Sequence, residues 1–204
     1  ITVPFNNSLI SKGICEAQSS FFGSGPGSEF RYSKKKHIYE VSSSAFCGMK
    51  REDLNKIGFY DESFIGSEDD ELNFRASKKG IKILVNPDTK VYYHSRENFY
   101  DFFIQYFYYG YHKYGFKKKY GKLLSKKIYV PAIFSILTTL MLASIFNLFS
   151  QLFLITILLL YSVISYGVTK KIKLIPATSI ALLLMHYAYG MGYNVAIIRN
   201  LFKK

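Results

Sequence analysis

Residues 128–169 read IYVPAIFSILTTLMLASIFNLFSQLFLITILLLYSVISYGVT and contain no Asp, Glu, Lys or Arg. As one helix they would extend about 63 Å at ~1.5 Å per residue, roughly twice the ~30 Å thickness of a bilayer hydrocarbon core. Two membrane crossings therefore fit this stretch better than one. We predict spans at 128–147 and 151–169, joined by a tight turn within 147–151.

A third apolar stretch, 174–198, is interrupted by Pro176, His186, Gly190 and Gly192. Six Lys precede the first span and three follow the second, so the positive-inside rule puts both flanks and the soluble part on the cytoplasmic side. A third crossing would leave Arg199 outside, against that rule. The stretch is either a span, which we favour, or an interfacial helix, and residues 128–204 form a transmembrane hairpin or a three-helix membrane region.

The charge of the chain is strongly positive, with 27 Lys+Arg against 14 Asp+Glu and a formal net charge of +13. The Lys clusters border the apolar segments instead of lying among base-stacking aromatics on a soluble face, which favours a membrane surface over nucleic acid. Cys15 and Cys47 are too few for a disulfide framework, so we predict free thiols in a reducing compartment. The chain begins at Ile1 without a signal peptide, and we expect it to be part of a longer protein.

Residues 98–124 are predicted to form a helix rich in Phe and Tyr that ends in a Lys cluster. Aromatic rings with polar edges above a basic tail suit the headgroup region, so residues 97–127 are interpreted as an amphipathic interfacial helix lying on the bilayer. The alternative is a helix packed into the soluble core, because the same aromatics could be buried there.

The soluble part, residues 1–96, is predicted to be α/β. The pattern indicates strands at 41–46, 81–85 and 91–94 and a short helix at 50–57. The Gly-rich stretch 22–28 lacks the spacing of a phosphate-binding loop and is interpreted as a flexible loop. In the apolar stretch 174–198, His186 is interpreted as a packed polar residue or a contact to a lipid-linked substrate.

An acidic helix start stands at Ser67-Glu68-Asp69-Asp70-Glu71. Ser67 is a predicted N-cap and Gly80 the matching stop, which gives a helix over 68–79. The carboxylates could simply be stabilised by the free amides of the first turn. Alternatively, one of them acts as a general base that takes a proton from a sugar hydroxyl. Arg75, four residues after Glu71, is expected to pair with it along the helix.

Three stretches of the soluble part carry a family resemblance: AFCGMKREDL at 45–54, IGFYDESF at 57–64 and SEDDELNFR at 67–75. Together they resemble the second half of family 2 glycosyltransferases, especially the succinoglycan-type exopolysaccharide branch. SFFG at 20–23 and FRYS at 30–33 are similar to the same branch. The resemblance covers roughly residues 1–115.

The resemblance implies that residues 1–96 are the acceptor-side part of a GT-A type domain. It implies a nucleotide-diphosphate sugar donor, a lipid-linked or saccharide acceptor, and inversion at the anomeric carbon. It places the catalytic base at Asp69, with Glu68 beside it. The predicted acceptor-binding residues are Gly48, Asp70, Glu71, Arg75 and Gln105.

Two departures from the family pattern qualify these expectations. The donor half, with its Asp-x-Asp motif, has no counterpart here, so a Mg or Mn cation would be held mainly by that missing half, with His94 as a candidate third ligand. These residues alone are then expected to be inactive. Processive relatives carry Gln-x-x-Arg-Trp, whereas Tyr108 and Tyr109 follow Gln105 here, which puts processive synthesis in doubt. The leading hypothesis is a transferase of the plasma membrane, and the alternative is a non-catalytic, membrane-anchored interaction module in polysaccharide assembly.

Overall fold

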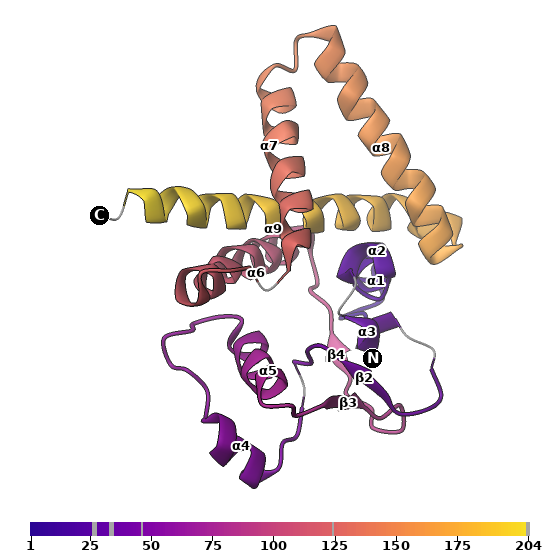
Figure 1. Cartoon of the computed structure of the whole chain (residues 1–204). Helices are drawn as coiled ribbons and strands as arrows, with labels where there is room; N and C mark the ends of the chain where they lie inside the picture. Colours follow the sequence, from indigo (N-terminus) through magenta and orange to yellow (C-terminus); the bar gives the residue numbers. More distant parts are fainter. Residues whose placement is uncertain (26–27, 33–34, 46, 124, 203–204) are drawn as a thin grey trace.

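The computed structural model describes residues 1–25, 28–32, 35–45, 47–123 and 125–202. Within these residues the chain is mostly helical (Figure 1). The helices are α1 Leu9–Gln18, α2 Phe21–Ser24, α3 Glu29–Tyr32, α4 Arg51–Ile57, α5 Glu68–Lys78, α6 Phe99–Tyr120, α7 Tyr129–Ala143, α8 Leu148–Thr169 and α9 Ile175–Leu201, with the 3-10 turns η1 Lys126–Ile128 and η2 Ile172–Leu174.

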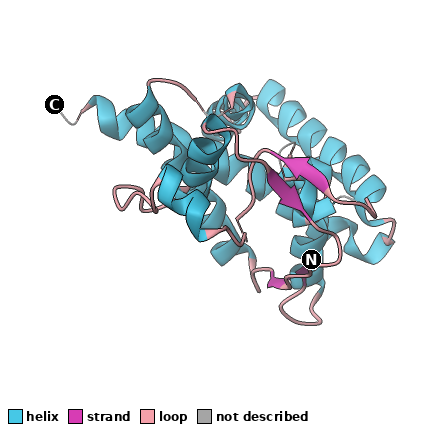
Figure 2. Ribbon diagram, turned by 60° about the horizontal axis from the view of Figure 1, so that its bottom comes forward, coloured by secondary structure: helices cyan, strands magenta, loops and turns pink. Residues whose placement is uncertain are grey.

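The described strands form two two-stranded sheets, drawn in magenta in Figure 2. Strand β1 (Thr2–Val3) pairs in parallel with β4 (Tyr93–His94), and β2 (Tyr39–Val41) pairs antiparallel with β3 (Ile83–Val85). Both helix predictions nearby, 50–57 and 68–79, are confirmed to within a residue. The α/β prediction is therefore confirmed only in part, because the described residues contain helices and only two small sheets.

The strand predicted at 41–46 is wrong in position, because β2 ends at Val41. Beyond it, Ser43 and Ser44 are engaged with α5. Ser43 Oγ donates to Asp70 (2.9 Å), and Asn73 Nδ2 donates to the Ser44 carbonyl (3.0 Å). Side-chain bonds to a helix thus replace the sheet ladder here. Phe46 lies outside the described residues. The stretch predicted as a loop at 22–28 begins inside α2, and residues 26–27 are also outside the described range.

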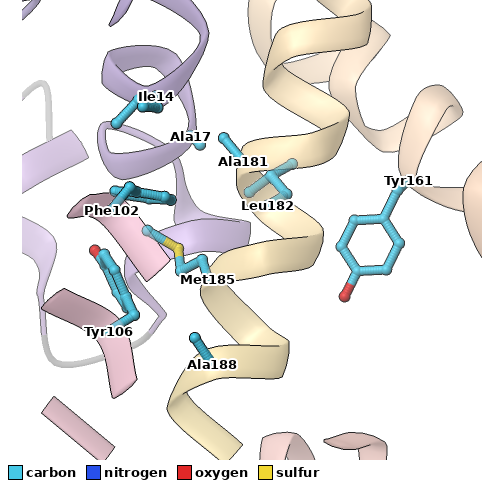
Figure 3. Packing of buried hydrophobic residues seen from close by; sticks show 9 residues of the cluster. All are labelled: Ile14, Ala17, Phe102, Tyr106, Tyr161, Ala181, Leu182, Met185 and Ala188. Atoms are coloured by element: carbon cyan, nitrogen blue, oxygen red, sulfur yellow. The ribbon is translucent and has the colours of Figure 1, made fainter. Parts of the chain in front are cut away.

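Helix α9 is the centre of the packing. It contacts α1, α2, α6, α7 and α8. Figure 3 shows Ala181, Leu182, Met185 and Ala188 of α9 among the buried residues that also come from α1, α6 and α8. At Gly190 an added Cβ would collide with the backbone of α7, so the helices cross at a distance that only glycine permits. This core joins the soluble part to the apolar helices.

Three helices are long and apolar enough to cross a membrane by length and composition: Lys126–Ala143, Leu148–Thr169 and Ile172–Leu201. The predicted turn between the first two is displaced, because α7 ends at Ala143 and α8 starts at Leu148. In α7 and α8 many large apolar side chains face outward, among them Ile133, Leu159 and Val163. The hairpin thus presents the surface that lipid chains would cover.

The third apolar helix differs from the hairpin in its surroundings. Half of its most apolar window is buried, against 22% for each of the other two. Figure 1 shows α9 running crosswise to α7, beneath the open end of the hairpin. If α7 spans the membrane, a helix that runs crosswise to it lies along the membrane surface. This arrangement corresponds to the interfacial-helix interpretation of 174–198 and not to the span.

Helix α6, predicted over 98–124, runs from the Asn98 N-cap to Tyr120, and Leu124 lies outside the described residues. It packs along α9, and Phe102, Tyr106 and Phe116 are buried. Its aromatic residues therefore contribute to the protein core on one face. Its predicted position on the bilayer stays a prediction.

Helices α4 and α5 form a separate small cluster around Ile57, Leu72 and Ala76. This cluster is joined to α6 through long side chains, with Phe74 of α5 packed edge-on against Phe116 (4.9 Å between ring centres) and tilted against Tyr120 (5.0 Å). The attachment places the first turn of α5 beside the C-terminal half of α6, where Asp70 meets Lys113 and Glu71 meets Tyr120.

Candidate active site

The first turn of α5 is not capped as predicted. Ser67 stands at the N-cap position as predicted, but its backbone is left-handed (φ 63°) and its side chain makes no cap hydrogen bond, so the predicted side-chain cap is wrong. Instead, the Asp70 amide donates to Asp69 Oδ1 (2.8 Å). A left-handed non-glycine residue costs about 1 kcal/mol or more and is held only by its surroundings. Next to it, a Cβ on Gly66 would lie 2.7 Å from the His112 ring, so glycine lets this loop approach α6.

A cavity of about 1200 Å³ opens at this helix start. Glu68, Asp69 and Asp70 line one part of it, and Tyr108, Tyr109 and His112 of α6 form a facing wall. Tyr60 lies there too, and burial, with the nearby Cys47, Asp69 and Glu68, raises the pKa of its hydroxyl. Aromatic walls with a few polar groups are typical of sites for small organic ligands. The predicted base and its neighbour therefore share one cavity.

Lys113 of α6 reaches the same carboxylates. Its ammonium forms an ion pair with Asp70, whose other oxygen accepts from Ser43 Oγ. Burial lowers the pKa of Lys113 to about 8, although Asp69 and Glu68 act in the opposite direction. A positive charge thus faces the three carboxylates at neutral pH and is lost in the mildly alkaline range.

Glu71 occupies a different environment, with no exposed side-chain surface. Arg75 Nε donates to both of its oxygens (3.0 Å each), Lys119 Nζ lies 3.2 Å from Oε1, and the Tyr120 hydroxyl donates to the same oxygen. Burial alone would raise the pKa of Glu71, but the hydrogen bonds from Arg75, Tyr120 and Lys119 outweigh it and the pKa is lowered. Glu71 is therefore a buried anchor between α5 and α6.

Arg75 is tied into the same network and does not line the cavity. Its guanidinium also donates to the carbonyls of Ile57, Gly58 (3.1 Å) and Phe59 (2.6 Å). The predicted pair with Glu71 is confirmed, and in this geometry both side chains hold α4, α5 and α6 together.

Three other predicted residues lie outside the cavity lining. Gly48 is exposed in the loop before α4. Gln105 is buried, and its Nε2 donates to the hydroxyls of Tyr93 (2.6 Å) and Tyr109 (2.8 Å), so it supports the aromatic wall from behind. His94 is exposed on β4. The structure thus brings together Glu68, Asp69 and Asp70, and leaves these three apart.

A divalent cation does not fit the residues at hand. In the described part of the chain, no three His, Cys, Asp or Glu side chains are grouped so that they could hold a metal ion. His94 is exposed and the carboxylate cluster is engaged with Lys113 and backbone amides. Cys15 and Cys47 are free, as predicted.

The sequence reading missed Lys113, His112, Tyr60 and Lys127, which also line the cavity. A signal existed in α6. Tyr109, Lys113, Phe116 and Tyr120 follow at spacings of four, three and four, which puts them on one helical face. The aromatic content of the helix obscures that face, because more than half of its positions carry a ring.

Comparisons with known proteins assign the chain to a family. Residues 33–195 match the family described as glycosyl transferase family group 2, so the chain belongs to that family. A curated relative, the succinoglycan biosynthesis protein ExoA of Rhizobium meliloti (strain 1021), is 37% identical over 103 residues. The resemblance to the succinoglycan branch of family 2 glycosyltransferases is thereby confirmed. That alignment covers 50% of this chain and 30% of the relative, and no solved structure matches the chain.

Proposed function

We propose that the chain is the acceptor side of a membrane-bound, inverting glycosyltransferase that transfers a sugar from a nucleotide-diphosphate sugar to a lipid-linked or saccharide acceptor. The observation that carries the proposal is the position of Asp69. It stands in the first turn of α5, in a cavity with an aromatic wall, in a member of a glycosyltransferase family. The donor half of a GT-A domain, with its Mg or Mn cation, would belong to the full-length enzyme outside these residues.

In the proposed reaction, an acceptor hydroxyl oxygen attacks the anomeric carbon of the donor sugar on the face opposite the diphosphate. The new C–O bond forms as the bond from that carbon to the diphosphate oxygen breaks. The nucleoside diphosphate leaves with the electron pair, and the hydroxyl proton passes to the Asp69 carboxylate. The Asp70 amide, which donates to Asp69 Oδ1, holds that carboxylate in place while the proton arrives.

We further propose that α7 and α8 span the plasma membrane with the acidic site on the cytoplasmic side. The Lys residues at the two feet of the hairpin support this orientation. Helix α9 then lies along the inner membrane surface, supported by its burial and its crosswise direction (Figure 1).

Replacing Asp69 by Asn in the full-length enzyme tests the proposal. Asn keeps the size of the side chain but cannot accept the proton, so we expect transfer to fall about 100- to 10,000-fold, the usual contribution of a general base. The measurement is transfer of label from a panel of radioactive nucleotide sugars into the lipid and polysaccharide fractions of membranes.

The matched control is Asp88→Asn, because Asp88 is exposed and outside the cavity. We expect it to transfer sugar like the wild type. Transfer by Asp69→Asn at the rate of the control would remove Asp69 as the base. Absence of transfer by the wild type with every donor of the panel would favour the non-catalytic interaction module.

A further inference from the structure

The cavity at Asp69 continues into the apolar helices. Besides the carboxylates of α5, its lining includes Phe134 of α7, Leu160 and Ile164 of α8, and Leu182 and Met185 of α9. One end is therefore acidic and the other is hydrocarbon. At about 1200 Å³ it also exceeds the ~300–1,000 Å³ of an ordinary small-molecule pocket. A cavity with this polarity gradient fits an amphipathic ligand.

The polar groups at the apolar end satisfy one another. His186 Nε2 lies 2.8 Å from the Phe22 carbonyl oxygen, so this nitrogen carries the proton and donates it. Nδ1 is then the acceptor, and the Tyr161 hydroxyl donates to it over 2.7 Å. With both ring nitrogens occupied, His186 offers a ligand no free polar group.

A positive charge stands between the two ends. Lys127, at the foot of α7, lines the cavity with Ile128 and Pro131. In the part of the chain that the structure describes, no carboxylate forms an ion pair with Lys127. Lys113, the other lysine of the lining, is already paired with Asp70. Arg31, which also lines the cavity, lies over the Tyr93 ring (5.5 Å to its centre). Lys127 is thus a cation that is available to an anionic group of a ligand.

From these observations, and resting on the proposed function, we propose that the apolar end binds the hydrocarbon chain of a phosphate-linked lipid acceptor, with its phosphate at Lys127. The chain lies between Phe134, Leu160 and Ile164. The saccharide carried by the phosphate extends along the aromatic wall toward Asp69. The occupant is a single-chain lipid phosphate, because the lining provides both a lysine and a slot of apolar side chains from three helices.

The first test uses two neighbouring leucines of α8. Leu160 lines the cavity, whereas Leu159 does not, and they are 55% and 63% exposed. Trp at either position needs no room in the core, so both variants should fold. We expect Leu160→Trp to fill the slot and weaken binding of tritiated farnesyl phosphate about tenfold or more, from the lost apolar contact. Leu159→Trp should bind it like the wild type.

The second test separates the phosphate from the chain. We expect Lys127→Gln to weaken farnesyl phosphate about tenfold and to leave farnesol unchanged, whereas Leu160→Trp weakens both. Binding is measured on the full-length protein in phosphatidylcholine nanodiscs. If phosphatidylglycerol competes as well as unlabelled farnesyl phosphate, the site is an ordinary lipid-facing surface. If inorganic phosphate competes as well, the hydrocarbon chain of the ligand has no role. Either result overturns the proposal.

If Leu160→Trp binds farnesyl phosphate as tightly as the wild type, the proposed site for the hydrocarbon chain is overturned as well. The assay needs no transfer, so it does not depend on the base. If Asp69→Asn transfers normally while the Leu160 and Lys127 variants lose farnesyl phosphate, the proposed catalytic role fails and the lipid site stands. If instead Asp69→Asn loses transfer while the Leu160 and Lys127 variants bind farnesyl phosphate normally, the lipid site fails and the proposed catalytic role stands.

Discussion

Asp69 and Glu71 are two residues apart in the same helical turn, yet their environments are opposite. Asp69 lines an open cavity and accepts a hydrogen bond from one backbone amide. Glu71 has no exposed side-chain surface and is bound by Arg75, Lys119 and Tyr120. A helix turns ~100° per residue, so four consecutive carboxylates must face different directions. The comparison separates carboxylates that can meet a substrate from one that fastens the helix to its neighbours.

Glu71→Gln should give the largest effect on stability. Removing the charge leaves Arg75 and Lys119 without their shared partner, and breaking such a pair costs about 3 kcal/mol. We expect the apparent Tm of the full-length protein to fall by about 5 to 10 °C. Thermal unfolding followed by a thiol-reactive dye or by circular dichroism measures it.

The exposed Glu62→Gln is the control, with an expected Tm like that of the wild type. Because the folded-state pKa of Glu71 is lowered, its contribution is complete above the unfolded value of about 4.3 and disappears as the pH falls below it. The Tm difference between Glu71→Gln and the wild type should therefore shrink on acidification. An unchanged Tm at neutral pH would contradict the anchoring role.

Much of this contrast could not be predicted from the sequence. The acidic helix start and the apolar segments were predicted well, because first-turn carboxylates and uncharged runs are local signals. The sequence places Glu71 with the acceptor site, because its local pair with Arg75 does not by itself indicate burial. Its partner Tyr120 is 49 residues away, and Lys113 is 43 residues from Asp70.

Two local predictions failed for a physical reason of their own. Ser67 is predicted to cap the helix with its side chain, but its backbone is left-handed, its side chain makes no cap hydrogen bond, and the Asp70 amide bonds to Asp69 instead. The strand predicted at 41–46 was read from β-forming residues, whereas serines 43 and 44 bond to α5. At residues 43 and 44 a tertiary contact with the acidic helix outweighed the local preference, whereas at Ser67 a bond between neighbouring residues of the first turn took the place of the cap.

The second prediction concerns the charge that faces the open carboxylates. With a pKa of about 8, Lys113 loses its proton as the pH rises from 7 to 9, so Asp70 loses its partner and the site becomes more negative. We expect sugar transfer to fall about tenfold by pH 9, where roughly one lysine in ten remains charged. The measurement is the pH profile of transfer in wild type and in Lys113→Arg, which stays charged and should keep its rate to higher pH. The same alkaline limb in both proteins would show that another group causes it.

The smallest expected effect is at Glu68, the most exposed of the carboxylates that line the cavity. No hydrogen bond to its side chain fixes it within the described part of the chain, so a neutral Gln should cost little stability. If Asp69 alone accepts the proton, Glu68→Gln should lower transfer by no more than about threefold, through a weaker field at Lys113 and Tyr60. Initial rates of Glu68→Gln and Asp69→Asn under the same conditions make the comparison. A loss at Glu68 as large as that at Asp69 would mean that the two carboxylates act together, and that the open face of α5 has a shared proton acceptor instead of a single base.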